Sequence, residues 1–157
     1  MVEHVALRLH LRSIREKNSD SIYEVEDFVR NCHAKIEDEI IFPSLKGVVA
    51  NNEQLVKVLS RLEADHRMIE KIGDQIRIRT AEGDLDTTRK RTMLYADVLE
   101  SHNSSEESLV FPFWSEYQPK GESDMLAKRV KQVIEEYGRD RYFRVTGISE
   151  KLLDLTS

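Results

Sequence analysis

A pattern of histidine and glutamate occurs twice in this chain of 157 residues. Residues 33–43 read HAKIEDEIIFP, and residues 102–112 read HNSSEESLVFP. On a helix, residues four apart lie on the same face, so each copy directs one imidazole and one carboxylate at the same point. The two pairs are His33 with Glu37 and His102 with Glu106. Nitrogen and oxygen ligands that converge from two facing helices suit a divalent transition metal such as iron, manganese or zinc.

The elements that must position these pairs are predicted to be helices. Charged residues make up 34% of the chain and aromatic residues only 7%, with six glycines and three prolines. No stretch of alternating apolar and polar residues is long enough to predict a sheet. The chain is long enough to bury a substantial core. The sequence therefore predicts an all-α protein.

Four long helices are expected, at about residues 2–17, 22–42, 53–80 and 87–112. Apolar residues recur in them at the three-four spacing of a buried stripe. The connections are short, which favours antiparallel neighbours and an up-down-up-down four-helix bundle. Pro43 and Pro112 are expected to end or bend the second and fourth helices.

A C-terminal part follows the predicted bundle. The segment QPKG at residues 118–121 breaks the chain, and a fifth helix is expected from Ser123 to about Tyr137. A short amphipathic tail then carries Ile148, Leu152 and Leu155. The predicted domains are a four-helix bundle at residues 1–118 and a C-terminal helical extension at residues 119–157 that packs on the bundle.

A third histidine lies in the apolar stripe of the third expected helix. His66 and His102 are centred on residue 84, which lies in the connection between the third and fourth helices. Antiparallel helices joined at that point would place the two imidazoles at the same height. The spacing therefore predicts that His66 and His102 face one another in the core.

The first helix offers two candidates for a partner of His33. The positions of His4 and His33 average to 18.5, and those of His10 and His33 average to 21.5. The first connection is centred near residues 19 to 20, so His4 is closer to level with His33. His4 also lies on one stripe with Leu7 and Leu11. We predict His4 as the ligand and keep His10 as the alternative.

The order of these motifs resembles the hemerythrin family, in its HHE-domain branch. The family pattern has a single histidine on helix one, His-x-x-x-Glu on helix two, a single histidine on helix three and His-x-x-x-Glu on helix four. The resemblance covers about residues 3–115. The phrases that carry it are Glu3-His4-Val5-Ala6-Leu7-Arg8, His33-x3-Glu37-Asp38-Glu39-x2-Phe42-Pro43, Asp65-His66-Arg67-Met68-Ile69 and His102-x3-Glu106-Glu107-x3-Phe111-Pro112.

This resemblance implies a non-haem di-iron centre. In the family, two carboxylates bridge two iron ions, histidines complete each coordination shell, and an oxo or hydroxo bridge joins the metals. An open position remains for O₂, NO or peroxide. Carried over to this chain, the bridging carboxylates are Glu37 and Glu106, and the histidine pairs are His4 with His33 and His66 with His102.

Glu70 departs from the oxygen-carrying hemerythrins, which have a histidine at this place, four residues after the histidine of helix three. It can be a further ligand, a hydrogen-bonding neighbour of the ligands or a surface charge, and we include it among the expected metal ligands. The same carriers have their last carboxylate where this chain has Glu107, whereas the HHE spacing matches Glu106. Both departures argue against reversible oxygen carriage. Asp38, Glu39 and Glu107 are expected to face solvent.

The resemblance implies a protein that binds or reduces O₂, NO or peroxide, in stress defence or sensing. A sensor of oxygen or iron would pass a change at the metal to a protein partner. Residues 123–157 are the candidate segment for that partner, because they lie outside the ligand-bearing repeats. No flavin or dinucleotide-binding fingerprint is present, so any reductant would come from outside. The sequence leaves open whether the protein is an enzyme.

Charge and composition bound the other possible partners. The net charge is −5 and no basic stripe is interleaved with aromatic residues, so no nucleic-acid partner is expected. No apolar run approaches the roughly 20 residues of a membrane span, and the N-terminus has no signal-peptide core. We therefore expect a cytoplasmic protein with no membrane partner. Cys32, the single cysteine, and Tyr95 are expected to pack in the core.

Overall fold

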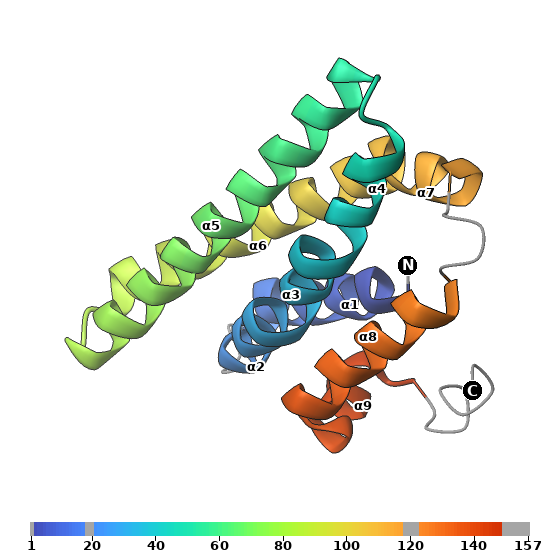
Figure 1. Cartoon of the computed structure of the whole chain (residues 1–157). Coiled ribbons are helices and arrows are strands. Elements are labelled where there is room, and N and C mark those ends of the chain that lie inside the picture. The colour runs from blue at the N-terminus through green and yellow to red at the C-terminus, as the bar shows by residue number, and fades with distance from the viewer. Residues whose placement is uncertain (1, 18–20, 118–122, 149–157) are drawn as a thin grey trace.

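The computed structural model of the chain describes residues 2–17, 21–117 and 123–148 (Figure 1). Within these ranges every regular element is a helix, and no strand occurs. Four helical stretches form a bundle: α1 (Val2–Lys17), the continuous run from α2 to α4 (residues 22–48), α5 (Glu53–Ala81) and α6 (Leu85–Leu109). The predicted all-α bundle is therefore confirmed. None of the described helices combines the length and the apolar character needed to cross a membrane.

The elements follow one another with short connections. In chain order they are α1 (Val2–Lys17), α2 (Ile22–Phe28), the π-helical segment η1 (Val29–His33), α3 (Ala34–Ile36), the π-helical segment η2 (Glu37–Ile41), α4 (Phe42–Val48), α5 (Glu53–Ala81), α6 (Leu85–Leu109), α7 (Phe111–Tyr117), α8 (Ser123–Tyr137) and α9 (Arg139–Thr146).

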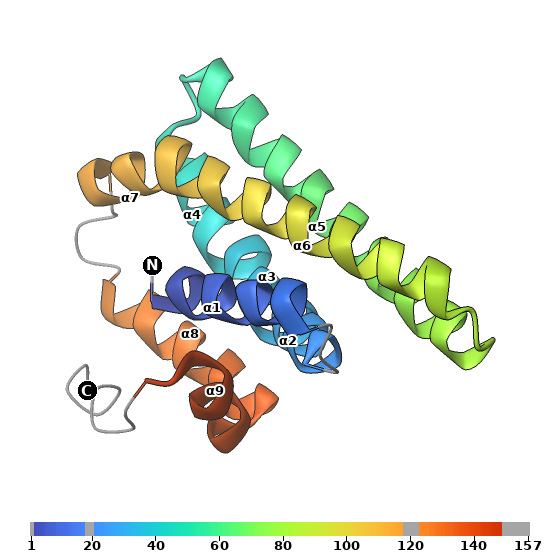
Figure 2. The same ribbon diagram turned by 180° about the vertical axis from the view of Figure 1, so that it is seen from behind.

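The longest helices, α5 and α6, form an antiparallel pair that extends well beyond the rest of the bundle (Figure 2). Each begins at a side-chain cap. The Asn52 carboxamide oxygen accepts from the Leu55 backbone N–H, and the Asp84 carboxylate accepts from the Thr87 N–H, both at 3.1 Å. The turn between the helices contains Gly83 at φ 75°, a left-handed conformation that glycine adopts without strain.

The sequence pattern predicted one regular α-helix here, but the run from α2 to α4 contains the two π-helical segments η1 and η2. The Ala34 N–H donates to the Val29 carbonyl and the Phe42 N–H donates to the Glu37 carbonyl, so both bonds span five residues. Such widened turns inside helices occur frequently at functional sites. The chain stays helical through Val48, so Pro43 does not end the helical path.

A contact from the C-terminal helices compensates for Pro43. In a regular α-helix the Glu39 carbonyl would accept from the backbone N–H of residue 43, which proline lacks. Here the guanidinium Nη2 of Arg129, on α8, donates to that carbonyl at 2.8 Å. A donor from a distant part of the chain thus satisfies a backbone acceptor that the sequence leaves without its usual partner.

Helices α8 and α9 lie against α1 and the α2–α3 stretch, on the side of the bundle away from α5 (Figure 1). The buried residues of this contact include Val133 and Tyr137 of α8 and Tyr142 and Val145 of α9. Helix α9 was not anticipated from the sequence. The expected tail positions Leu152 and Leu155 and the proposed boundary after residue 118 lie outside the described residues.

A buried acidic side chain explains a glycine in the middle of α5. Glu26 is 3% exposed and lies directly over Gly73, where an added Cβ would sit 2.7 Å from the Glu26 Cγ. The Glu26 carboxylate is held in place by Arg30, with Nε at 2.9 Å, and by Arg77, with Nε at 2.9 Å. The side chain therefore cannot move aside without breaking these ion pairs.

We expect Gly73→Ala to lower the free energy of unfolding. Alanine improves helix propensity by about 1 kcal/mol, but overpacking at a fixed neighbour costs about 1–3 kcal/mol. Gly47→Ala in α4 is the matched control, because an added Cβ there meets no atom of the described residues within 4 Å. Denaturant unfolding of both variants separates the gain in helix propensity from the cost of overpacking. Equal stabilisation by both substitutions would contradict the role given to Glu26.

Candidate metal centre

Six buried side chains from all four bundle helices converge in the core. Their ligand atoms form two groups, each with its atoms within 4.8 Å of one another, and both groups contain Glu37 and Glu106. One group adds His4 and His33, and the other adds His66 and His102. The least buried of the six is 6% exposed. The structure thus brings together six of the seven residues that the sequence predicted as metal ligands.

The imidazole Nε2 atoms all point at the two shared carboxylates. His33 Nε2 lies 3.4 Å from Glu37 Oε2, and His66 Nε2 lies 3.2 Å from the same atom. On the other carboxylate, His4 Nε2 lies 3.4 Å from Glu106 Oε2, and His102 Nε2 lies 3.3 Å from Glu106 Oε1. As the register predicted, His66 and His102 are level, with ring centroids 4.4 Å apart.

A carboxylate outside the cluster faces the Nδ1 atom of every one of these histidines. This set was not predicted from the sequence: Asp38 and Glu107, which were expected to face solvent, are only partly exposed and contact His66 and His4. His33 Nδ1 donates to Glu3 at 2.8 Å, and His66 Nδ1 donates to Asp38 at 2.8 Å. His4 Nδ1 donates to Glu107 at 3.1 Å. His102 Nδ1 lies 3.9 Å from Asp65. Such outer partners fix the tautomer, so Nε2 is left free to accept a metal.

These outer carboxylates follow a simple positional rule. Each is the sequence neighbour of a residue in the cluster, but it serves a histidine on a different helix. Glu3 precedes His4, and Asp65 precedes His66 in the same way. Asp38 and Glu107 follow the two shared glutamates at matching places in the repeated pattern. The repeat seen in the sequence therefore extends to the groups that orient the ligands.

The charges of the cluster depend on one another. Burial lowers the pKa of His4, but the nearby carboxylates of Glu106 and Glu37 outweigh it and raise the pKa to about 9. Burial likewise lowers the pKa of His66, while Asp38 and Glu37 raise it to about 10. Burial raises the pKa of Glu37, yet the surrounding histidines, His33 foremost, bring it well below its usual range. The raised pKa values of His4 and His66 and the lowered pKa of Glu37 therefore favour charged imidazoles beside a charged Glu37 carboxylate.

The donor set fits metal ions. Several buried side-chain atoms have no hydrogen-bond partner among the described residues, including the Nε2 atoms of all four histidines, Oε2 of Glu37 and both carboxylate oxygens of Glu106. Unpaired buried polar atoms are costly, and these atoms lie in two overlapping groups whose members are within 4.8 Å of one another. Ligands held about 2.0–2.2 Å from a common ion lie roughly 3 Å apart, close to the 3.2–3.4 Å separations above. Imidazole with carboxylate suits iron and other transition metals.

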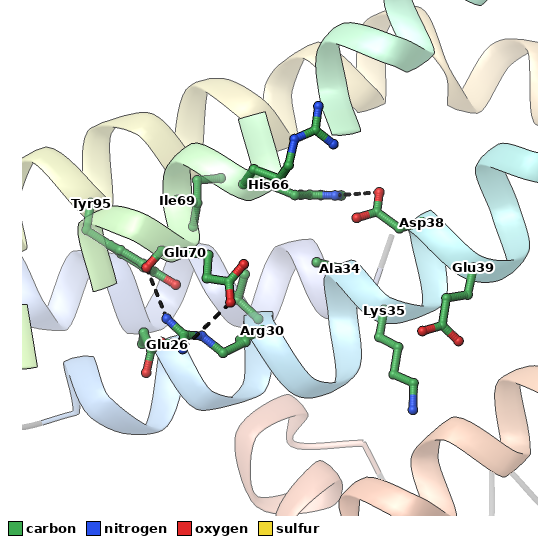
Figure 3. Close-up of a pocket in the computed structure, with 12 residues that line it drawn as sticks. Glu26, Arg30, Ala34, Lys35, Asp38, Glu39, His66, Ile69, Glu70 and Tyr95 are labelled. Carbon is green, nitrogen blue, oxygen red and sulfur yellow. Dashed lines mark hydrogen bonds and ion pairs between the residues drawn. The ribbon is translucent and has the colours of Figure 1, made fainter. Parts of the chain in front are cut away.

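The structure does not bring the seventh predicted ligand into the cluster. The Glu70 side chain is 52% exposed, and its Oε1 lies 3.8 Å from Arg30 Nη1. Figure 3 shows Glu70 directed at Arg30, whereas His66 is hydrogen-bonded to Asp38. Glu70 and His66 are four residues apart, but the buried stripe of α5 is narrow and Glu70 lies outside it. Of the three readings open for Glu70, this position matches a surface charge.

The alternative ligand on α1 also lies elsewhere. His10 Nε2 donates to the Val145 carbonyl of α9 at 2.9 Å, away from the cluster. His4 is 1% exposed, and its imidazole is packed against His33 with ring centroids 5.1 Å apart. Of the two candidates on α1, the structure places His4 within reach of the shared carboxylates.

The paired variants His4→Ala and His10→Ala test this placement. We expect His4→Ala to reduce the metal content by about one ion per chain, because one half of the cluster loses an imidazole. His10→Ala should keep the full metal content, since only its contact with α9 is lost. Metal analysis of both purified variants decides the point, and loss of metal only in His10→Ala would overturn the assignment.

Two other buried groups, Tyr95 and Cys32, belong to neither ligand group found among the described residues. Tyr95 is 1% exposed and burial raises its pKa, and burial also raises the pKa of the Cys32 thiol. Both side chains belong to the main hydrophobic core. This placement agrees with the packing role that the sequence predicted for them, because a thiol is reactive as the thiolate.

A four-helix bundle with a buried histidine and carboxylate cluster defines a class of helical metal-binding proteins. Within that class, the hemerythrin HHE cation-binding domain matches residues 1–114, and the chain belongs to this family. Searches of curated proteins and of solved structures gave no match. The matched residues include all six members of the cluster, and the family's description as a cation-binding domain agrees with its geometry.

Proposed function

We propose that the cluster holds two iron ions and that the protein binds O₂, NO or peroxide at them. The observation that carries this proposal is the pair of ligand groups that share Glu37 and Glu106. A carboxylate common to two groups can bridge two ions, and each ion then has two histidines of its own. A single ion cannot engage both histidine pairs, so the arrangement favours a dinuclear centre.

The residues of this chain supply binding, orientation and exclusion of water. Glu37 and Glu106 provide the negative charge, and the outer carboxylates hold the imidazoles with Nε2 toward the centre. Phe42 stacks on His66 with ring centroids 5.8 Å apart, and Phe111 lies 5.1 Å from His4, so apolar rings cover the cluster. Iron bound there would supply electrons and an open coordination position for a small ligand.

The size of the neighbouring pockets supports a small ligand. A pocket of about 270 Å³ reaches His66 and Asp38 from one side, with Tyr95 at its far end (Figure 3). Another of about 280 Å³ reaches His102 and Asp65. Both are at the small end of the roughly 300–1,000 Å³ typical of sites for larger organic ligands. A diatomic molecule or peroxide is a better match than a bulky substrate.

A second candidate function is a sensor of oxygen or iron that signals to a protein partner through the C-terminal segment. The contact of α8 and α9 with α1 and with the segments that carry His33 and Glu37 favours it. Such a sensor and a stress-defence protein would use the same metal centre. They differ in whether the bound ligand is turned over or only changes the structure.

Metal content and the visible spectrum of the reduced protein, before and after exposure to O₂ and NO, test the proposal. About two irons per chain and a new absorption band that reverses under vacuum would support a ligand-binding sensor. Irreversible oxidation, or turnover of NO or peroxide with an added reductant, would support stress defence. Iron far below stoichiometric amounts after anaerobic reconstitution would overturn the di-iron proposal.

A further inference from the structure

Glu3, the outer carboxylate of His33, has a second partner on the C-terminal extension. Its Oε2 accepts from His33 Nδ1, and its Oε1 accepts from the Tyr142 hydroxyl of α9, both at 2.8 Å. Tyr142 is 5% exposed, so this hydrogen bond is shielded from solvent. A chain of two hydrogen bonds thus connects α9 to a residue of the candidate metal centre.

The position of Tyr142 is fixed by packing. Its ring lies 6.0 Å from that of Phe28, which in turn stacks on His33 with ring centroids 6.2 Å apart. The contact between His10 and Val145 anchors the same helix to α1. Tyr142 therefore meets Glu3 from a rigid support, which is a requirement for orienting a ligand accurately.

The other outer carboxylates are held differently in the described part of the chain. Glu107 is paired with Arg8 of α1, and Asp65 lies 3.9 Å from Arg61 of its own helix. Asp38 is partly exposed beside the pocket at His66. Among the described contacts, α9 supports only the carboxylate that serves His33. The hydrogen bond from α9 to Glu3 should therefore affect the His33 half of the centre and not the other.

We propose that Tyr142 is a positioning residue for the His4–His33 half of the metal centre. It holds Glu3, and Glu3 orients the His33 imidazole with Nε2 toward the shared carboxylates. Tyr142 lies beyond the residues that match the family, so this contact is additional to the family's domain. Because coupling between two equilibria is reciprocal, metal in this half also strengthens the docking of α9. This inference rests on the proposed metal site.

Tyr142→Phe and its matched control Tyr137→Phe test the inference. Both tyrosines belong to the extension and pack on Phe28, but the Tyr137 hydroxyl donates to Asp27 and not to Glu3. Anaerobic titration with Co²⁺ against a competing chelator measures the two binding steps. Loss of an outer partner of a ligating histidine typically costs about 10–100-fold in metal affinity. Tyr142 is one bond further out, so we expect about 3–10-fold weakening of one step only.

A double-mutant cycle with Glu3→Gln separates positioning from general packing. Tyr142 and His33 donate to different oxygens of Glu3, and glutamine replaces one of these oxygens with an NH2 group that can only donate, so one of the two hydrogen bonds is lost. We expect Glu3→Gln to weaken the same binding step, and Tyr142→Phe to add little in that background. Hydrogen exchange of residues 139–146 should slow when Co²⁺ binds the unaltered protein. That protection should shrink in Tyr142→Phe and persist in Tyr137→Phe.

The outcomes are distinct. Unchanged Co²⁺ binding in a folded Tyr142→Phe protein would overturn the inference while the metal site stands. Equal weakening by Tyr137→Phe, or additive losses in the cycle, would also overturn it, because general docking of the extension would then explain the effect. If Tyr142→Phe fails to fold, Glu3→Gln and the exchange measurement on the unaltered protein decide. Failure of the unaltered protein to bind Co²⁺ and iron would instead refute the proposed function.

Discussion

Replacing Glu106 with glutamine is expected to remove both metal ions from the protein. Glu106 is fully buried and belongs to both ligand groups, so its charge and its second acceptor oxygen serve both halves of the centre. His102→Ala removes a ligand from one group only and should retain about one ion per chain. The loss of affinity in Glu106→Gln should exceed the roughly 10–100-fold caused by losing an outer partner.

Metal analysis after anaerobic reconstitution measures this effect, and Glu70→Gln is the matched control. Glu70 is also a glutamate on a bundle helix, but its carboxylate faces Arg30 at the surface. We expect Glu70→Gln to keep two ions per chain. Two ions per chain in Glu106→Gln would show that the carboxylate does not bridge, and equal losses in both variants would contradict the placement of Glu70.

Metal removal should lower the melting temperature by about 8–16 °C for each site. An ion present at 1,000 times its dissociation constant adds about 4.1 kcal/mol to the free energy of unfolding. For a protein of this size each kcal/mol shifts the melting temperature by about 2–4 °C. The unpaired Nε2 atoms and carboxylate oxygens in the core are the physical source of the effect. Thermal unfolding with and without a chelator provides the measurement.

The effect of metal removal should grow with pH. Because the pKa values of His4 and His66 are raised above 6.5 in the fold, their protonation stabilises the metal-free protein fully below pH 6.5. That contribution disappears as the pH rises through about 9 and 10. Metal binding requires neutral imidazoles, so metal affinity rises over the same range.

The metal-free protein should therefore melt at a lower temperature at pH 9.5 than at pH 6.5, whereas the metal-loaded protein should change less. Glu70→Gln, which is altered outside the cluster, should follow the unaltered protein at both pH values. Equal melting temperatures of the metal-free protein at the two pH values would contradict the protonated state assigned to these histidines.

The residues of the cluster were predictable because helical periodicity is a local property. Each His-x-x-x-Glu pair lies on one face of its helix, and His66 lies on an apolar stripe. The periodicity alone therefore places these side chains on the faces that the bundle buries. The positions of residues along neighbouring helices could be compared because short connections favour antiparallel helices. The same reasoning preferred His4 to His10, and the structure brings His4 to the shared carboxylates.

Periodicity was not enough where a residue lies at the edge of a stripe. Glu70 lies one helical turn after His66, yet the small rotation between them puts its carboxylate outside the core, where Arg30 meets it. Whether an edge position faces a metal or an arginine depends on the neighbouring helix, which the spacing within α5 does not specify. The widened turns around His33 and Glu37 could not be predicted either, because the sequence pattern there is compatible with a regular helix.

The sequence by itself thus determined the all-helical fold, the order of the bundle helices and seven candidate ligands, six of which meet in the core. The tertiary structure alone decided which carboxylates support the histidines and which element supports Glu3. Those contacts join residues that are 28 to 139 positions apart, such as Asp38 with His66 and Glu3 with Tyr142. Hydrogen bonds of that kind require separate helices to be positioned within a few tenths of an ångström, and only the packing of the whole bundle sets that distance.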